Sequence, residues 1–335
     1  MISIVMPVRD AATTLPATLD SVLRQTERTW ELLAIDDGSA DGSSAILAAY
    51  AGRDSRIRVL HEARRGLVPA LNAGLRAATG ALIARLDADD VCLDSRLAQQ
   101  RRHLESHPET GLVASRVSFG GDPVRAAGYA RHVAWTNRLV THDDISLARF
   151  VESPLAHPSV MFRRALVERW GGYVDGDFPE DYDLWLRWLE AGVRMDKLAA
   201  TLLIWNDSPT RMSRRDPRYT EDAFYRLKSR YLARWLAANN PHHPAVMLWG
   251  AGRVTRQRAR HLLTHGITVE AFVDIDRRKV GRLIDGRWVV DPAALPPPGT
   301  SFLVSYVGSA GAREEIEASL RARGYRPGCD YILAA

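Results

Sequence analysis

The feature that most constrains the fold is the alternation of short apolar runs with helix-like segments in the first third of the chain. Strand-like runs cover residues 3–7, 31–35, 57–60 and 81–86, and segments with helical periodicity separate them. This βαβα order predicts a mainly parallel sheet with helices on both faces. We therefore assign the chain to the α/β class. Polar residues follow three of the runs, which predicts a ligand site at the carboxyl edge of the sheet.

Length and composition predict two ordinary domains. The chain has 335 residues, of which 46% are hydrophobic and 25% are charged. These values suit globular domains and are unlike those of disordered or membrane-embedded chains. Residues 101–206 have a looser pattern, typical of an α+β extension of the first domain. Two prolines at 241–244 interrupt both helical and strand periodicity and predict a linker. We therefore place the domains at 1–240 and 245–335.

The second domain opens with a new βαβ unit. A strand-like run at 246–249 leads through a glycine-rich turn into a helix, and the next strand-like run ends at Asp274. The turn matches half of a dinucleotide-binding fingerprint, because Thr255 replaces its third glycine. Gly250, Gly252 and Asp274 thus form a candidate second nucleotide site in a small Rossmann-like domain. Acceptor binding and subunit assembly are equally open roles.

The charge indicates which class of ligand the chain binds, and the cysteine content excludes two kinds of structural site. The net charge is +5, and only three of the 45 basic residues are lysine. Arginine binds phosphate in a planar, bidentate manner, which favours anionic substrates or an anionic membrane face, although codon bias in a GC-rich genome gives the same excess. We expect no nucleic-acid partner. The two distant cysteines, Cys92 and Cys329, predict neither a disulfide nor a zinc site.

The chain carries no apolar run of about 20 residues, the length that spans a bilayer. Its first residues lack the basic flank, apolar stretch and cleavage site of a signal peptide. We therefore expect a cytoplasmic protein, with peripheral association at the inner membrane face as a further expectation.

Three acids follow the fourth strand-like run. Asp87, Asp89 and Asp90 lie within four residues, and their mutual repulsion is tolerable in a solvated loop or where a cation neutralises them. Mg²⁺ and Mn²⁺ prefer oxygen ligands and bridge phosphate oxygens. The cluster is therefore a candidate metal site, with a plain acidic loop as the alternative.

Two further segments carry groups that suit a nucleotide. A turn-rich acidic loop around Asp37, with Pro7 and Arg9 at the end of the adjacent strand-like run, offers acceptors for a base and a ribose. Its alternative role is simple turn and helix-cap chemistry. In the segment that begins with Arg65, a glycine allows close backbone approach, and Arg65 and Asn72 can face a diphosphate.

Five segments of the chain, taken in their order along the sequence, resemble the motifs of glycosyltransferase family 2. The likeness extends over residues 1–215. The resemblance implies the nucleotide-diphospho-sugar transferase fold called GT-A. It also implies an inverting enzyme that depends on Mg²⁺ or Mn²⁺. The matching segments are residues 5–10, 21–26, 36–39, 65–72 and 86–90.

The resemblance assigns a role to each matching residue. Pro7, Arg9 and Asp37 line the base pocket, where Asp37 accepts a hydrogen bond from the imide N–H of the base. At the acid cluster, Asp87 lies near the ribose, Asp89 binds the metal, and Asp90 supports that arrangement. The donor-binding and metal residues implied are Pro7, Arg9, Asp37, Arg65, Asn72, Asp87, Asp89, Asp90, Arg211 and Arg214.

A later segment of the same family pattern implies the catalytic base. It places that base at Asp181, in the pair Glu180–Asp181. Inversion requires in-line attack, so a carboxylate must take the proton of the acceptor hydroxyl. A helix cap is the alternative role for Asp181. Residues 206–216 predict a mobile loop whose Arg211 and Arg214 close over the donor diphosphate, or else a solvated basic loop.

The function predicted is the transfer of one sugar from a nucleotide diphosphate donor, UDP-sugar first, to a hydroxyl group. The acceptor expected is a glycan or lipid-linked saccharide of cell-envelope or capsular polysaccharide synthesis. Two rivals remain. A nucleotidyltransferase shares the α/β core, but its usual glycine-rich N-terminal loop is missing. A non-catalytic nucleotide-sugar or NAD sensor would use Gly250, Gly252 and Asp274.

Overall fold

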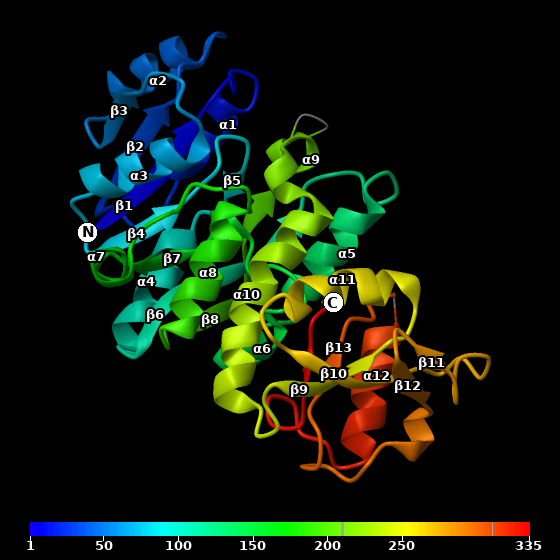
Figure 1. Cartoon of the computed structure of the whole chain (residues 1–335). Helices are drawn as coiled ribbons and strands as arrows, with labels where there is room; N and C mark the ends of the chain where they lie inside the picture. Colours follow the sequence, from blue (N-terminus) through cyan, green and yellow to red (C-terminus); the bar gives the residue numbers. More distant parts are fainter. Residues whose placement is uncertain (209–210, 310) are drawn as a thin grey trace. The chain divides into compact units, whose positions relative to one another are not determined.

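The computed structural model describes residues 1–208, 211–309 and 311–335 and divides into two compact units (Figure 1). The first unit is Met1–Ile145 with Pro154–Asp216, and the second is Ser146–Ser153 with Pro217–Ala335. The sequence assigns helix α10 (Glu221–Asn239) to the first domain, whereas the compact units part at residue 216. The functional division at 1–240 and 245–335 stays a prediction.

An eight-stranded sheet forms the centre of the first unit, in the order β3-β2-β1-β4-β7-β6-β8-β5. Its first four strands are parallel to one another and lie where the apolar runs predict them. They are β1 (Ile2–Val8), β2 (Trp30–Asp36), β3 (Ile57–His61) and β4 (Leu82–Arg85). The helices between them are α1 (Leu15–Leu23), α2 (Ser43–Ala51) and α3 (Leu67–Ala77).

The other four strands build the predicted α+β extension. Two long strands, β6 and β8, pair in parallel along their whole length, and the short β7 joins them to β4 in antiparallel register. These strands are β5 (Val91–Cys92), β6 (Thr110–Phe119), β7 (Met161–Arg163) and β8 (Arg194–Trp205). The helices are α4 (Arg96–Ser106), α5 (Ala127–Thr136), α6 (His142–Ala148), α7 (Ala165–Trp170), α8 (Glu180–Glu190) and α9 (Met212–Arg215).

Two hydrophobic layers cover the two faces of this sheet. Successive strand residues point to opposite faces, so in β1 Ile4 and Met6 join one layer and Val5 joins the other. Helices α1, α2 and α4 contribute to the first layer, and α3 and α8 contribute to the second. In α8, the side chains of Trp185 and Trp188 are fully buried. The acid-bearing start of α8 is thereby fixed against the sheet.

The second unit contains a six-stranded sheet in the order β11-β12-β10-β9-β13-β14. Its five parallel strands, β12-β10-β9-β13-β14, follow the 3-2-1-4-5 order of Rossmann-type folds. The predicted second α/β domain is therefore confirmed. Its strands are β9 (Ala245–Trp249), β10 (Thr268–Val273), β11 (Leu283–Ile284), β12 (Arg287–Val290), β13 (Leu303–Ser305) and β14 (Tyr331–Leu333). Its other helices are α11 (Arg253–Leu263) and α12 (Ala312–Ala322).

None of the helices in the described ranges is long and apolar enough to cross a membrane.

Candidate active site

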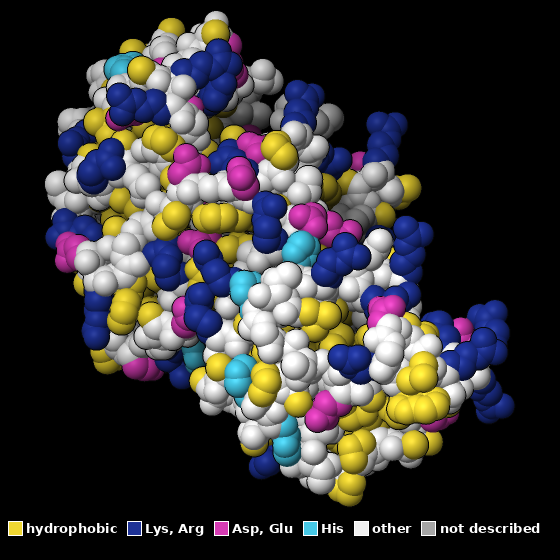
Figure 2. All heavy atoms as spheres, viewed as in Figure 1, with side chains coloured by type: hydrophobic (Ala, Val, Ile, Leu, Met, Phe, Trp, Pro, Cys, Tyr) yellow, Lys and Arg dark blue, Asp and Glu magenta, His cyan; other side chains and the backbone are white. Residues whose placement is uncertain are grey.

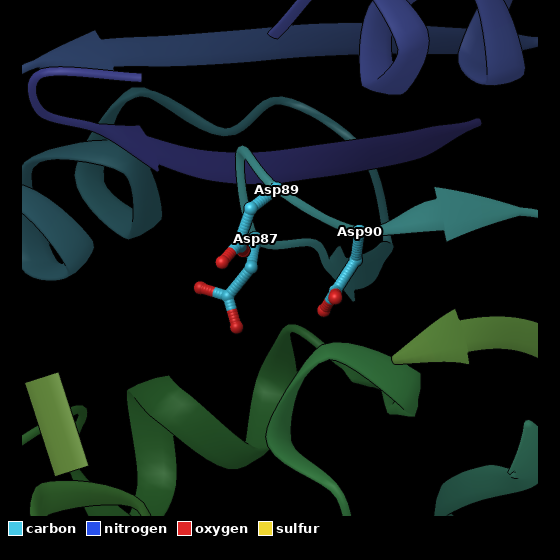
Figure 3. A group of neighbouring side chains, drawn as sticks. All are labelled: Asp87, Asp89 and Asp90. Atoms are coloured by element: carbon cyan, nitrogen blue, oxygen red, sulfur yellow. The ribbon is translucent and has the colours of Figure 1, made fainter. Parts of the chain in front are cut away.

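The predicted acid cluster forms a tight turn between β4 and β5. The backbone N–H of Asp90 donates to the carbonyl of Asp87 at 3.3 Å, which folds the three acids toward one another. Asn206 fixes the turn from outside, because its N–H donates to Asp90 Oδ1 at 2.8 Å and its amide donates to the carbonyl of Asp89 at 2.6 Å. Figure 3 shows the three carboxylates on the same side of this turn.

The three carboxylates can hold a cation together. One oxygen of each lies within 4.8 Å of an oxygen of the others. Asp90 is fully buried, and its Oδ2 has no hydrogen-bond partner among the described residues. A buried carboxylate oxygen without a donor is costly unless a ligand satisfies it. The set of hard oxygen atoms therefore fits Mg²⁺ or Mn²⁺.

The electrostatics of the turn agree with this interpretation. Burial, together with the charge of Asp87, raises the pKa of Asp89 to about 6. Burial and the charges of Asp87 and Asp89 raise the pKa of Asp90 well above its usual value. The charge of Arg211 lowers both pKa values. The turn thus holds more negative charge than its surroundings neutralise, and a divalent cation would remove that excess.

A buried cation, Arg85, lies directly before the acids and was not among the predicted site residues. It is the last residue of β4, is 2% exposed, and forms an ion pair with Asp87. Burial disfavours its charge, but Asp87, Tyr173 and Asp90 raise its pKa, so it stays ionised. The signal that could have revealed it is an arginine inside an otherwise apolar strand that ends at three acids.

The second acid pair begins α8. Pro179 precedes the helix, Glu180 is buried, and Asp181 is half-buried. Burial and the charge of Glu180 raise the pKa of Asp181 to about 7, and the charge of Arg85 partly offsets this rise. Asp181 also accepts a hydrogen bond from the N–H of Tyr182 at 2.7 Å. The carboxylate therefore interacts with the first helical turn and still has a pKa suited to proton transfer near neutral pH.

Arg85 connects the two acid groups electrostatically. Its charge acts on the pKa values of Asp89, Asp181 and His157. Burial, aided by Arg85, lowers the pKa of His157 well below its usual value, so this imidazole is neutral. The structure therefore brings the predicted metal acids and the predicted base around one buried arginine.

The loop before α8 is held by contacts that the sequence does not reveal. The side chain of Asn72 bridges the backbone of Tyr173, since its Nδ2 donates to the carbonyl at 2.9 Å and its Oδ1 accepts from the N–H at 3.1 Å. The Tyr173 hydroxyl lies 2.7 Å from His157 Nε2. The structure thus gives Asn72 a positioning contact; its predicted contact with a diphosphate stays a prediction.

The predicted base-pocket residues meet at the carboxyl ends of β1 and β2. Arg9 Nη1 lies 3.5 Å from Asp37 Oδ2, and Pro7 is half-buried beside them in β1. Asp37 accepts hydrogen bonds from the N–H groups of Arg65 and Gly66, at 2.6 and 3.1 Å from Oδ1. Gly66 has φ +96°, which favours glycine at this sharp entry to α3. Asp37 thus fixes the entry to α3, and its contact with a base imide stays a prediction.

The predicted arginine loop is partly helical. Helix α9 occupies residues 212–215, while Pro209 and Thr210 lie outside the described residues. The guanidinium of Arg211 lies over the ring of Trp205, 4.2 Å from its centroid, and its charge reaches the acid turn. Arg214 forms an ion pair with Asp207 at 2.6 Å. Of this pair, Arg211 therefore acts on the pKa values of the acid turn, whereas Arg214 is paired with Asp207.

In the candidate second nucleotide site, the carboxylate of Asp274 is already paired. Asp274 accepts from the N–H groups of Ala251 and Asp276, both at 2.9 Å, and from Lys279 Nζ at 3.0 Å. Gly250, with φ +105°, faces the side chain of Thr255, whose Oγ1 lies 2.7 Å from where a Cβ would be. The structure brings Gly250 and Asp274 together as predicted, but nucleotide binding there stays a prediction.

Comparisons with known proteins agree with the fold and the motifs. The family profile of "Glycosyl transferase family 2" matches residues 3–171, about half of the chain. The chain is 30% identical over 227 residues to the "Putative glycosyltransferase EpsE" of Bacillus subtilis, covering 66% of this chain and 78% of EpsE. A shorter match, 40% identical over 101 residues, joins 30% of this chain to 39% of the Escherichia coli "UDP-Glc:alpha-D-GlcNAc-diphosphoundecaprenol beta-1,3-glucosyltransferase WfgD".

Two solved structures share the fold. Residues 1–349 of S. aureus TarS, in complex with UDP-GlcNAc, align with a TM-score of 0.56 and 16% identity, covering 79% of this chain and 71% of that one. The mannosyltransferase PcManGT of Pyrobaculum calidifontis, in complex with GDP-Man and Mn²⁺, aligns with a TM-score of 0.53 and 18% identity, covering 79% and 68%. The first unit has the GT-A fold. The chain belongs to glycosyltransferase family 2.

Proposed function

We propose that this glycosyltransferase moves a sugar from a nucleotide diphosphate donor to an acceptor hydroxyl, with inversion at the anomeric carbon. The observation that carries the proposal is the turn after β4. There, three carboxylates converge, and a fully buried oxygen of Asp90 has no partner among the described residues. Such a set is suited to a divalent cation, and family membership makes a nucleotide-sugar the substrate to test.

The acid turn would hold Mn²⁺ or Mg²⁺ through Asp87, Asp89 and Asp90. A bound cation supplies positive charge for the diphosphate that leaves during transfer. The protein's own residues prepare this place. Arg85 forms an ion pair with Asp87, and Asn206 orients Asp90. PcManGT, which shares the fold, was solved with Mn²⁺.

Asp181 is the proposed general base. With its pKa raised to about 7, a substantial fraction is ionised at neutral pH and can still accept a proton efficiently. In-line attack needs that carboxylate on the face opposite the leaving diphosphate. Glu180, buried beside Asp181, raises the proton affinity of the base through its charge. Arg85 opposes that effect and keeps the pKa near neutrality.

The donor site would be formed by the residues that meet at the ends of β1 and β2, namely Pro7, Arg9, Asp37 and Arg65, with Arg211 facing the diphosphate. UDP-sugar is the donor to try first, because TarS was solved with UDP-GlcNAc and WfgD is named for UDP-Glc. GDP- and dTDP-sugars follow, since PcManGT was solved with GDP-Man.

The acceptor proposed is a glycan or a lipid-linked saccharide in cell-envelope or capsular polysaccharide synthesis. The name of WfgD describes a diphosphoundecaprenol-linked acceptor. Such an acceptor implies an enzyme that works in the cytoplasm and at the inner face of the membrane.

The direct test is a donor screen. Purified protein with Mn²⁺, each sugar nucleotide and a crude lipid-linked acceptor should release the free nucleoside diphosphate with one donor, and the anomeric configuration of the product should be inverted. Asp94→Asn, a change at a 60% exposed side chain near the acid turn, provides the control. Release of pyrophosphate instead would identify a nucleotidyltransferase. Retention of configuration would exclude Asp181 as the base of an inverting step.

A further inference from the structure

Large apolar side chains are exposed on the hairpin of β11 and β12 in the second unit. Leu283 and Trp288 lie directly opposite each other in the antiparallel register, so both side chains are on the same face of the hairpin. Each is 58% exposed. All nine tryptophans lie in the described ranges, and Trp288 is the exposed one among them. A tryptophan and a leucine side by side in water suggest an interacting surface.

The hairpin holds this pair in a defined geometry. Its two-residue turn, Asp285–Gly286, has positive φ at both positions, +48° and +72°, as a type I′ turn requires. The carboxylate of Asp285 pairs with Arg256 of α11 at 2.7 Å. The N–H of Val289 donates to the carbonyl of Arg282 at 2.9 Å, which continues the ladder. The exposed pair is therefore presented by an ordered element.

Basic residues are frequent in the hairpin and in the segment before it. Figure 2 shows hydrophobic side chains over β11 and β12, with lysine and arginine side chains beside them. Residues 275–288 contain five Lys and Arg against two Asp and Glu. The whole segment 217–335 contains 18 basic and 11 acidic residues, a net +7, so the rest of the chain carries −2. The positive charge of the protein is thus concentrated in the second unit.

A basic groove lies between the hairpin turn and α11. Arg253, Arg256 and Arg260 recur at helical spacing on one face of α11 and line this groove of ≈ 430 Å³ together with Leu263 and Asp285. Leu263 is 42% exposed. Arginines around an apolar residue in a groove of this size suit a phosphate head group whose acyl chains continue beyond it.

We propose that the hairpin pair Leu283 and Trp288, with the arginine groove of α11, docks the second unit on an anionic lipid membrane. Tryptophan favours the boundary between head groups and acyl chains, and arginine is attracted to anionic head groups. A second copy of the chain is a poorer occupant, because a two-fold contact would oppose the same arginines. This inference deepens the membrane part of the proposed function and depends on it only for the location of the acceptor.

Vesicle flotation tests the proposal. The full chain is mixed with vesicles of phosphatidylglycerol and phosphatidylcholine, and separately with vesicles of phosphatidylcholine alone. We expect flotation with the anionic vesicles and little with the neutral ones. We also expect binding to weaken between about 0.01 M and 0.15 M salt, over which the Debye length falls from about 30 to about 8 Å.

Variants separate the apolar and basic parts of the surface. Trp288→Ser with Leu283→Ser should lower the partition coefficient about tenfold or more, the factor expected from losing one buried large apolar side chain. Arg253→Gln with Arg260→Gln should lower it by a similar factor, since each basic residue near an anionic surface contributes a several-fold gain. Val124→Ser, at an 85% exposed apolar side chain of the first unit, should bind like the wild type.

Three outcomes would overturn the proposal: no flotation of the wild type, equal flotation with neutral vesicles, or unchanged flotation of the Trp288→Ser and Leu283→Ser variant. Sedimentation velocity that shows a dimer dissolved by this variant, without vesicle binding, would assign the surface to self-association. Calorimetric binding of UDP or GDP with Mn²⁺, measured on the same samples, keeps the two proposals apart. Docking without nucleotide binding would contradict the proposed function alone, and nucleotide binding without docking would contradict this inference alone.

Discussion

Both units place aspartates just beyond a strand at the carboxyl edge of a parallel sheet, and the two places differ in how their carboxylates are satisfied. In the first unit, Asp90 is fully buried, its Oδ2 has no hydrogen-bond partner among the described residues, and the pKa of Asp89 is raised to about 6. In the second, Asp274 has three donors. Burial opposes its charge, but hydrogen bonds from Asp276 and Ala251 and the Lys279 ammonium lower its pKa.

This difference is the one expected between a ligand site and a structural turn. Acids that keep an unpaired oxygen and a raised pKa store unfavourable electrostatic energy that a bound cation removes. An acid with complete partners and a lowered pKa stabilises the turn by itself. The glycine-rich turn of the second unit therefore resembles a nucleotide site in sequence, while its acid already acts as a structural support.

The largest effect is expected from Asp89→Asn. The variant removes one carboxylate charge from the turn, so metal-dependent transfer should fall about 10³-fold or more. Initial rates with saturating Mn²⁺ and donor measure the loss. Asp94→Asn should retain the wild-type rate, and full activity of Asp89→Asn would remove the acid turn from the mechanism.

Asp181→Asn should lower the transfer rate about 10²- to 10⁴-fold, the range for losing a general base, and leave nucleotide binding intact. Asp181 accepts a proton only when ionised, so the wild-type rate should rise with pH through about 7, the raised pKa of this group. A pH–rate profile measures this limb. Glu190→Gln, at the exposed end of α8, is the control. A rate that does not change between pH 6 and 8, about one unit on each side of the raised pKa, would contradict the role of Asp181 as the base.

Arg85→Met should have a smaller effect on rate, combined with a characteristic shift. Arg85 lowers the pKa of Asp181, so its removal should move the rising limb of the pH profile to higher pH. Leaving Asp87 without its buried partner should also cost about 1–3 kcal/mol of stability. Arg85→Lys restores the charge and should return the limb toward the wild-type position. An unshifted limb in Arg85→Met would contradict the link between the two acid groups.

Asp274→Asn should leave transfer unchanged and lower the free energy of unfolding by about 1–3 kcal/mol. Because the pKa of Asp274 is lowered in the folded protein, its stabilisation is present above the unfolded value near pH 4 and is lost as pH falls through the folded value. Denaturant unfolding at pH 7 and at low pH measures this. A loss of transfer with unchanged stability would instead indicate that the second unit binds the nucleotide through Asp274.

The sequence predicts the sheet edge well because strand period and acid spacing are local signals. The first four strands lie where their patterns place them, and the acids after β4 do converge. Contacts between distant residues could not be predicted in this way. Asn72 bridges the backbone of Tyr173, 101 residues away, and no local pattern encodes that partner.

Two other features could not be predicted from the sequence, because they also depend on the folded structure. The role of Arg85 depends on its burial and on its ion pair with Asp87. An arginine in an apolar strand that ends at three acids is a signal for such a role, but the burial itself is set by the packing of distant segments. The hairpin of β11 and β12 is too short to give a periodic signal, so its exposed pair became visible only with the cross-strand register.

We propose above all that the acid turn after β4 is the metal site on which nucleotide binding depends. Calorimetric titration of UDP, GDP and dTDP, with Mn²⁺ or with EDTA, tests it on the wild type, Asp89→Ala and Asp274→Asn. We expect metal-dependent binding of one nucleotide that Asp89→Ala abolishes and Asp274→Asn retains. Binding that is independent of metal, survives Asp89→Ala and disappears in Asp274→Asn would contradict it.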